Sequence, residues 1–64
     1  MKRRETALET VAKIDRMLVE AREHSSVLLC ERITSLAMRG IASAAQAMEA
    51  QMLREKIMKA RGEP

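Results

Sequence analysis

The amino-acid sequence predicts an all-α fold, a helical hairpin of two or three helices that completes a bundle by dimerisation or by binding a partner. Nearly every residue favours helix, and the β-branched residues are scattered without the alternation that is typical of strands. The chain has only two glycines and one proline, and that proline is its last residue. We expect one small domain, 1–64, with frayed ends at 1–5 and 62–64.

The first helix is expected to begin near Thr6. The segment from Thr6 to Glu9 has the form of a capping box, in which the threonine hydroxyl accepts a hydrogen bond from a backbone N–H. Apolar residues then recur at alternating steps of four and three, the spacing of a helix that buries one seam. The members of this seam are Ala7, Val11, Ile14, Leu18 and Ala21.

Around residues 24–26 the seam loses its phase. Apolar positions resume, one residue out of step, as Leu29, Ile33 and Leu36. A stutter would let one long helix continue with a rotated face, whereas a break would let Ser25 or Ser26 cap a new helix. Because no glycine or proline marks this position, the continuous helix is the preferred interpretation.

Gly40 is the clearest candidate for a turn. It follows Arg39, whose charge suits a helix C-terminus, and glycine readily adopts the left-handed conformation that ends many helices. Ser43 and Gln46 then supply a second capping box. A turn built on Arg39, Gly40 and Ser43 is therefore favoured over a single helix that runs through Gly40.

The last helix, which is expected to end near Ala60, carries two apolar stripes about a quarter turn apart. The first stripe is Ile41, Ala45, Met48 and Met52, and the second is Leu53, Ile57 and Ala60. One stripe is expected to pack on the first arm and the other on a partner. The arm before the turn is longer than the arm after it, so a two-helix monomer would leave part of its seam uncovered. A break into three helices would weaken this argument for a partner.

Residues 33–48 contain a single charged residue, Arg39, between flanks that are crowded with charge. Since the chain has no aromatic residue to fill a core, this segment is the best candidate for a surface that is buried against another protein. The residues expected at that interface are the large apolar members of both arms: Val11, Ile14, Leu18, Leu29, Ile33, Leu36, Met48, Met52, Leu53 and Ile57.

The methionines allow two interpretations. Methionine is flexible and fills irregular gaps in a core, but it also forms surfaces that accept varied helical partners. The residues concerned are Met17, Met38, Met48, Met52 and Met58. The core interpretation is preferred for them.

The sequence favours no catalytic or metal-binding function. It contains no phosphate-binding loop, nucleophile elbow or His-Glu-x-x-His motif. Cys30 and His24 are the only cysteine and histidine, too few for a structural zinc site, and Cys30 is expected to be a small buried apolar residue. We expect no enzyme activity, no cofactor or metal, and no small-molecule substrate.

The location expected from the sequence is the cytoplasm. The basic start of the chain is not followed by the apolar region of a signal peptide. The longest weakly polar run falls short of the roughly 20 apolar residues that a membrane span needs. A single cysteine also fits a reducing compartment, and no membrane partner is expected.

The leading functional hypothesis is a protein-binding adaptor, co-chaperone or inhibitor that forms a homodimer or binds a helical protein. A nucleic-acid-binding regulator is the first alternative, because basic residues gather near both ends of the chain: Lys2, Arg3, Arg4, Arg54, Lys56, Lys59 and Arg61. Acidic residues lie among them, the net charge is only +3, and no aromatic residue is present to stack on bases. The second alternative is a bundle that only assembles with itself.

The layout resembles small helical-hairpin proteins of bacteria. One such family comprises the co-chaperones that hold needle subunits in type III secretion, which have a long first helix, an Arg-Gly turn and a second amphipathic helix. Met38-Arg39-Gly40 occupies the corresponding turn, so the resemblance covers most of the chain by shape and three residues by motif. Small plasmid-encoded hairpin dimers that regulate replication, and phage inhibitor proteins, are similar in size. The resemblance implies a hairpin that binds other macromolecules.

Overall fold

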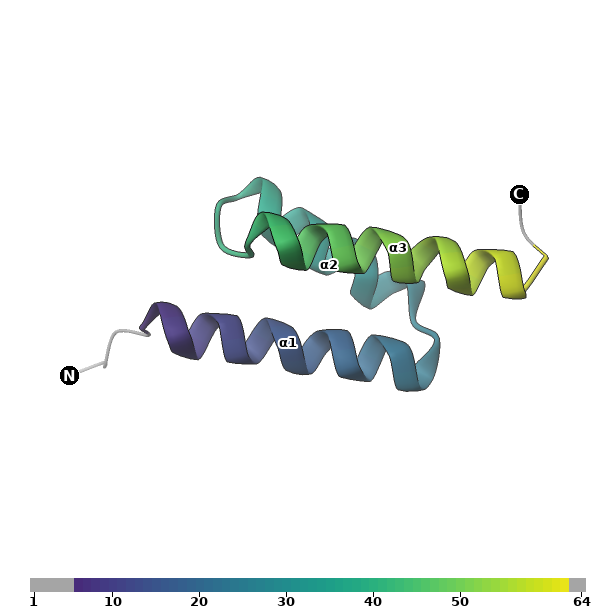
Figure 1. Cartoon of the computed structure of the whole chain (residues 1–64), viewed down its shortest axis with the longest axis horizontal. Coiled ribbons are helices and arrows are strands. Elements are labelled where there is room, and N and C mark those ends of the chain that lie inside the picture. Colours follow the sequence, from purple (N-terminus) through teal and green to yellow (C-terminus); the bar gives the residue numbers. More distant parts are fainter. Residues whose placement is uncertain (1–5, 63–64) are drawn as a thin grey trace.

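The computed structural model describes residues 6–62, and this part of the chain folds into three helices. They are α1 (Ala7–His24), α2 (Val27–Met38) and α3 (Ala44–Ala60). α1 and α3 run in the same direction, and α2 runs in the opposite direction (Figure 1). The predicted all-α fold is confirmed. The predictions for residues 1–5 and 63–64, including those for the basic residues at 2–4, lie outside the described residues.

α1 begins where the sequence predicts. Thr6 is its N-cap, and the Thr6 hydroxyl oxygen accepts a hydrogen bond of 3.1 Å from the backbone N–H of Glu9. The preference for one continuous first arm is wrong, because α1 ends at His24. Ser25 adopts the left-handed conformation with φ of 49°, and the N–H of Ser26 donates to the carbonyl oxygen of Ala21 at 2.9 Å.

Ser26 then begins the second helix. Its hydroxyl oxygen accepts from the N–H of Leu29 at 3.2 Å, as an N-cap residue does. The slip in the apolar pattern is therefore resolved by a break and not by a stutter. α2 folds back on α1, so the chain does not consist of one long arm and one short arm. The inference that unequal arms would leave part of a seam uncovered in a monomer therefore no longer applies.

The turn at Gly40 is confirmed. The N–H of Gly40 donates to Ala37 and that of Ile41 donates to Leu36, at 3.0 Å and 2.9 Å to the carbonyl oxygens. These two bonds form the Schellman motif, which requires a positive φ, and Gly40 has a φ of 79°. Arg39 is the C-cap of α2, and Ser43 is the N-cap of α3.

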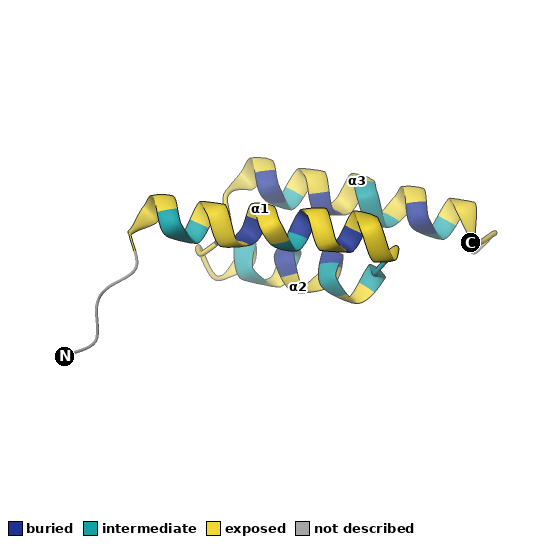
Figure 2. Ribbon diagram, turned by 90° about the horizontal axis from the view of Figure 1, so that it is seen from below, coloured by how far each residue is buried: buried dark blue, intermediate teal, exposed yellow. Residues whose placement is uncertain are grey.

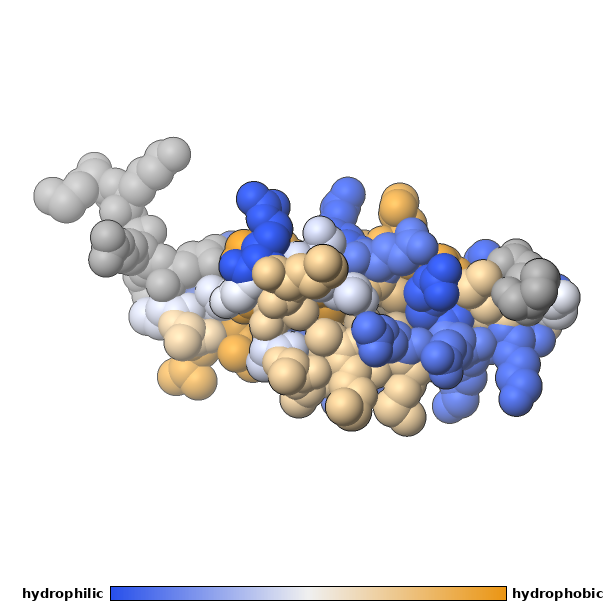
Figure 3. All heavy atoms as spheres, turned by 90° about the horizontal axis from the view of Figure 1, so that it is seen from above, coloured by the Kyte–Doolittle hydropathy of each residue, from blue (hydrophilic) through white to orange (hydrophobic). Residues whose placement is uncertain are grey.

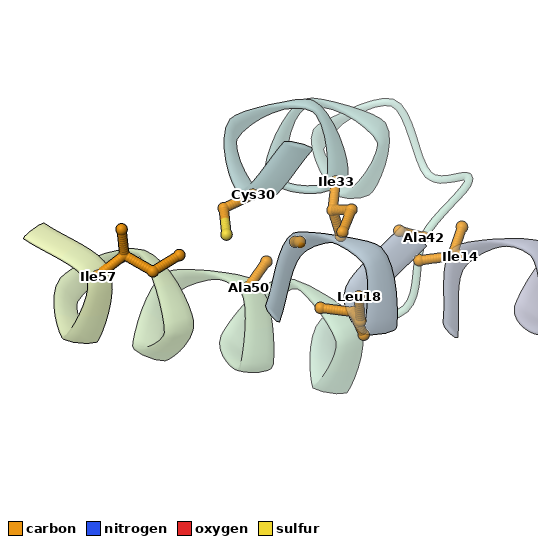
Figure 4. Packing of buried hydrophobic residues seen from close by; sticks show 8 residues of the cluster. Ile14, Leu18, Cys30, Ile33, Ala42, Ala50 and Ile57 are labelled. Carbon is orange, nitrogen blue, oxygen red and sulfur yellow. The ribbon is translucent and has the colours of Figure 1, made fainter. Parts of the chain in front are cut away.

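The core lies where the three helices face one another (Figures 2 and 4). Ile14 and Leu18 come from α1, Ile33 from α2 and Ile57 from α3, and they are the only large aliphatic side chains among the buried residues that the structure describes. Small residues complete the core: Ala21, Cys30, Ala42 and Ala50. Small side chains let the helices approach closely, but they bury little apolar area, so the core stabilises this fold only modestly.

Candidate protein-interaction surface

The ten residues predicted at an interface fall into three groups in the structure. Four lie inside the protein's own core: Ile14, Leu18, Ile33 and Ile57. Three are partly buried against that core: Leu29, Leu36 and Leu53. The remaining three are exposed: Val11, Met48 and Met52. Within this set, Met48 and Met52 are more than half exposed, whereas Val11 is 41% exposed.

The preferred interpretation of the methionines as core residues is wrong for three of them. Met48 and Met52 are 63% and 65% exposed, and Met38 is 85% exposed. Met17 packs against the core from a partly buried position, and Met58 is also partly buried. An exposed methionine on each of two successive turns of α3 makes a continuous apolar strip.

We call this strip the α3 stripe, which consists of Ile41, Ala45, Met48 and Met52. Ile41 lies in the turn before α3, and the other three lie on the helix at steps of three and four. All four are exposed. The opposite side of α3 is buried through Ala50 and Ile57. Of the second predicted stripe, Ile57 is buried and Leu53 partly buried, but Ala60 is exposed, so that stripe faces the core only in part. The stripe that turns away from the core is the one that carries the methionines.

Apolar surface gathers over the N-terminal half of α3, whereas hydrophilic side chains cover its C-terminal half (Figure 3). This distribution reproduces the charge-poor segment 33–48 on the folded surface. The segment also supplies buried residues, since Ile33 and Ala42 belong to the core. The low charge of segment 33–48 therefore suits both the residues that it buries in the core and the residues that it leaves exposed.

Two shallow hollows lie between α1 and the α3 stripe. The first, of about 410 Å³, lies where the start of α1 meets the turn before α3, and Val11, Ile41 and Ala42 line it. The second, of about 330 Å³, lies near the end of α1 and is lined by Arg22, Met52 and Lys56 among others. The two ends of the stripe therefore each border a depression that an apolar side chain can enter.

Gln46 joins α1 to α3 between these hollows. It is only 5% exposed, and its side-chain nitrogen Nε2 donates to the Val11 carbonyl oxygen at 3.1 Å and to Asp15 Oδ1 at 3.0 Å. Its oxygen Oε1 accepts from the N–H of Ser43 at 3.0 Å, and its own N–H donates to Ser43 Oγ at 3.1 Å. This capping box was predicted, but the contact with α1 was not.

The exposed residues Leu8 and Ile41 were also missing from the predicted interface. Leu8 lies in the first turn of α1 and is exposed, and it is not a member of the seam that the spacing predicted. Ile41 was assigned to the correct stripe, and its place in the turn gave no signal of exposure.

The basic residues of α3 are partly engaged within the molecule. Arg54 forms an ion pair with Glu31, with 3.4 Å between Arg54 Nε and Glu31 Oε2. Arg61 Nη2 donates to the Ser25 carbonyl oxygen at 2.9 Å. Lys56 and Lys59 are exposed. Two of the four basic side chains that the nucleic-acid alternative needs at this end of the chain thus contact α2 and the α1–α2 turn.

Cys30 lies in the core, as expected, with its sulfur directed toward α3 (Figure 4). Burial raises the pKa of its thiol, and the nearby Arg54 guanidinium acts in the opposite direction more weakly. A buried thiol with a raised pKa is a poor nucleophile.

Within residues 6–62, no three histidine, cysteine, aspartate or glutamate side chains are grouped closely enough to hold a metal ion. No helix in this described range is long and apolar enough to cross a membrane. Comparisons with protein-family models, with curated proteins and with solved structures found no significant match to this chain.

Proposed function

We propose that this chain is a non-enzymatic protein-binding module, of the adaptor, co-chaperone or inhibitor class, which holds a helical partner against the α3 stripe. The observation that carries the proposal is the exposure of Met48 and Met52 on one face of a helix whose opposite face contributes Ala50 and Ile57 to the core. Two adjacent exposed methionines on a regular helix provide an adaptable apolar surface.

The setting of the stripe supports a helical partner. One hollow lies beside Ile41 and the other beside Met52, and each is bordered by α1. A helix that spans both hollows presents apolar side chains at intervals of three, four and seven residues, which is how amphipathic helices bind to apolar surfaces. Polar residues lie near or line these hollows: Asp15, Arg22, Glu49 and Lys56.

The proposal is tested with two matched variants, Met52→Lys on the stripe and Met38→Lys on α2. Both replace an exposed methionine by a lysine of equal helix propensity, so neither should alter folding. A protein captured by the wild type from extracts of its source cells is purified, and its affinity for all three chains is measured by calorimetry.

We expect Met52→Lys to weaken binding about 10- to 100-fold, the cost of losing one buried methionine, and Met38→Lys to leave it unchanged. Equal loss of binding in both variants would contradict the proposal. Binding of nucleic acid that weakens steeply with salt and is lost when Lys56 and Lys59 are neutralised would support the nucleic-acid regulator instead. Capture of nothing but further copies of the chain would favour the self-assembling bundle.

A further inference from the structure

Three methionines are the accessible sulfur side chains among the residues that the structure describes. Met38, Met48 and Met52 are 85%, 63% and 65% exposed, whereas Met17 and Met58 are partly buried. A thioether reacts with hydrogen peroxide without first losing a proton, so access decides which methionine is oxidised. The exposed three are therefore the methionines that an oxidant reaches first.

Cys30, the one thiol of the chain, is protected from the same oxidant. Its side chain is 0% exposed, and burial raises the pKa of the thiol, so little of the reactive thiolate forms in the folded protein. Peroxide attacks cysteines that are accessible and ionised, and Cys30 is neither. Oxidation of the folded chain therefore falls on its surface and not on its core.

Met48 and Met52 lie on successive turns of the same exposed face of α3, about 6 Å apart along the helix axis. The opposite face packs in the core through Ala50 and Ile57. Oxidation converts the apolar thioether of methionine into a polar sulfoxide. Two sulfoxides on this face make the α3 stripe polar and leave the core contacts of the helix as they are.

We infer that Met48 and Met52 form a reversible oxidation site, at which hydrogen peroxide turns the α3 stripe from a binding surface into a non-binding one while the fold stays intact. This inference rests on the proposed function and supplies its regulation. At each site the O–O bond of the peroxide breaks, one oxygen atom joins the sulfur, which loses two electrons, and water leaves. Methionine sulfoxide reductases reverse the step with a dithiol, which becomes a disulfide as the oxygen leaves in water.

Met38 provides the matched control for this site. It is the last residue of α2 and lines a different hollow, between α2 and α3, together with the polar residues Thr34, Gln51 and Arg54. A sulfoxide at this position adds one more polar group to a polar border and leaves the stripe unchanged. An effect that requires Met48 and Met52 but not Met38 is therefore an effect of the stripe.

The first test maps the oxidation of the wild-type chain by hydrogen peroxide, with and without urea, at about pH 5.5, where thiols are almost fully protonated. Cleavage after arginine, lysine and glutamate places the five described methionines on separate peptides for mass spectrometry. We expect Met48 and Met52 to react within about threefold of their rates in urea, and Met17 at least about fivefold more slowly than in urea. Cys30 should stay reduced until the stripe has reacted, and circular dichroism should show unchanged helicity.

The second test measures how apolar the stripe is, by the retention of the folded chain on a phenyl resin before and after oxidation. The double variant Met48→Leu, Met52→Leu cannot be oxidised at the stripe, and Met38→Leu cannot be oxidised on α2. Leucine resembles methionine in volume and helix propensity, so both variants should fold as the wild type does. Oxidation should shorten the retention of the wild type and of Met38→Leu but change that of the double variant little. Methionine sulfoxide reductases A and B with dithiothreitol should restore it.

The third test repeats the calorimetry with the partner protein that tests the proposed function. Oxidised wild type and oxidised Met38→Leu should bind this partner at least about tenfold more weakly than the untreated wild type does. The double leucine variant should bind it equally well before and after treatment with peroxide.

Protection of Met48 and Met52 in the folded chain would overturn the inference, as would a double variant that loses retention on oxidation as the wild type does. An oxidised wild type that binds the partner with undiminished affinity, although Met52→Lys abolishes binding, would also overturn it and would leave the proposed function standing. If Met52→Lys binds the partner as the wild type does while the peptide map and the retention are as expected, the proposed function is excluded and the oxidation site stands.

Discussion

Gln46 shows at the scale of single residues how one side chain serves two purposes. Its oxygen completes the capping box of α3 with Ser43, and its nitrogen reaches across to Val11 and Asp15 on α1. Buried polar atoms that lack a hydrogen bond are costly, and every buried side-chain nitrogen and oxygen of the described residues has a partner. The first turns of α1 make few apolar contacts. The hydrogen bonds from Gln46 therefore help to fix the position of this part of α1.

Gln46→Glu separates these two purposes. The glutamate keeps an oxygen for the N–H of Ser43, but it has no donor for the Val11 carbonyl and sets a second carboxylate beside Asp15. We expect the free energy of unfolding at neutral pH to fall by about 2–3 kcal/mol, measured by urea denaturation. The deficit should shrink as the pH falls, because the protonated carboxyl group regains a donor.

The matched control for this change is Gln51→Glu, which makes the same substitution at an exposed position of the same helix. It should alter the free energy of unfolding by less than about 0.5 kcal/mol. If both variants lose stability equally, the contact between Gln46 and α1 contributes nothing, and the loss reflects the added charge alone.

At the scale of elements, the junction of α1 and α2 marks the limit of what the sequence predicts. The helix starts at Thr6 and Ser43 and the turn at Gly40 were all predictable, because each depends on local hydrogen bonds by residues suited to them. At the break between α1 and α2, Ser26 is suited to cap the new helix, but Ser25 must take a positive φ, which serine rarely adopts. The break forms because folding α2 back buries Ala21, Cys30 and Ile33 together, a gain that only the tertiary structure provides.

The candidate surface was predictable to a similar extent. The two stripes of α3 follow from helical periodicity, and the structure shows which one faces outward. The roles of Met48 and Met52 were misjudged because composition reveals only that a chain without aromatic residues needs apolar volume. Whether a given methionine supplies that volume depends on where the other helices lie.

Ser25→Gly should stabilise the protein. Glycine adopts a φ of 49° without the steric cost that a serine pays there, so we expect the free energy of unfolding to rise by about 0.5–1 kcal/mol. Thermal denaturation followed by circular dichroism measures the change. Ser35→Gly, at an exposed position inside α2, is the control and should lower stability by about 0.5 kcal/mol through helix propensity alone. A loss of stability in both variants would show that the conformation of Ser25 is not strained.

At the scale of the whole molecule, a thin core is accompanied by several exposed apolar side chains. Only four large aliphatic side chains are buried among the described residues, and Met38, Met48 and Met52 are all exposed. Cores of this size in short chains supply at most about 3–5 kcal/mol of net stability. Covering the α3 stripe would add apolar burial that the isolated chain lacks, so association and stability are expected to be coupled.

Cys30 offers a direct measure of that coupling. Its thiol is fully buried and burial raises its pKa, so a thiol reagent at neutral pH reacts only when the core opens. With about 3 kcal/mol of stability, labelling should be roughly 100-fold slower than in urea.

Ser25→Gly should slow the labelling of Cys30 further, and Gln46→Glu should speed it. Adding a protein that binds the α3 stripe should slow labelling of the wild type more than labelling of Met52→Lys, because a partner that binds the folded chain stabilises it. Labelling as fast as in urea would mean that the core around Cys30 does not persist in solution.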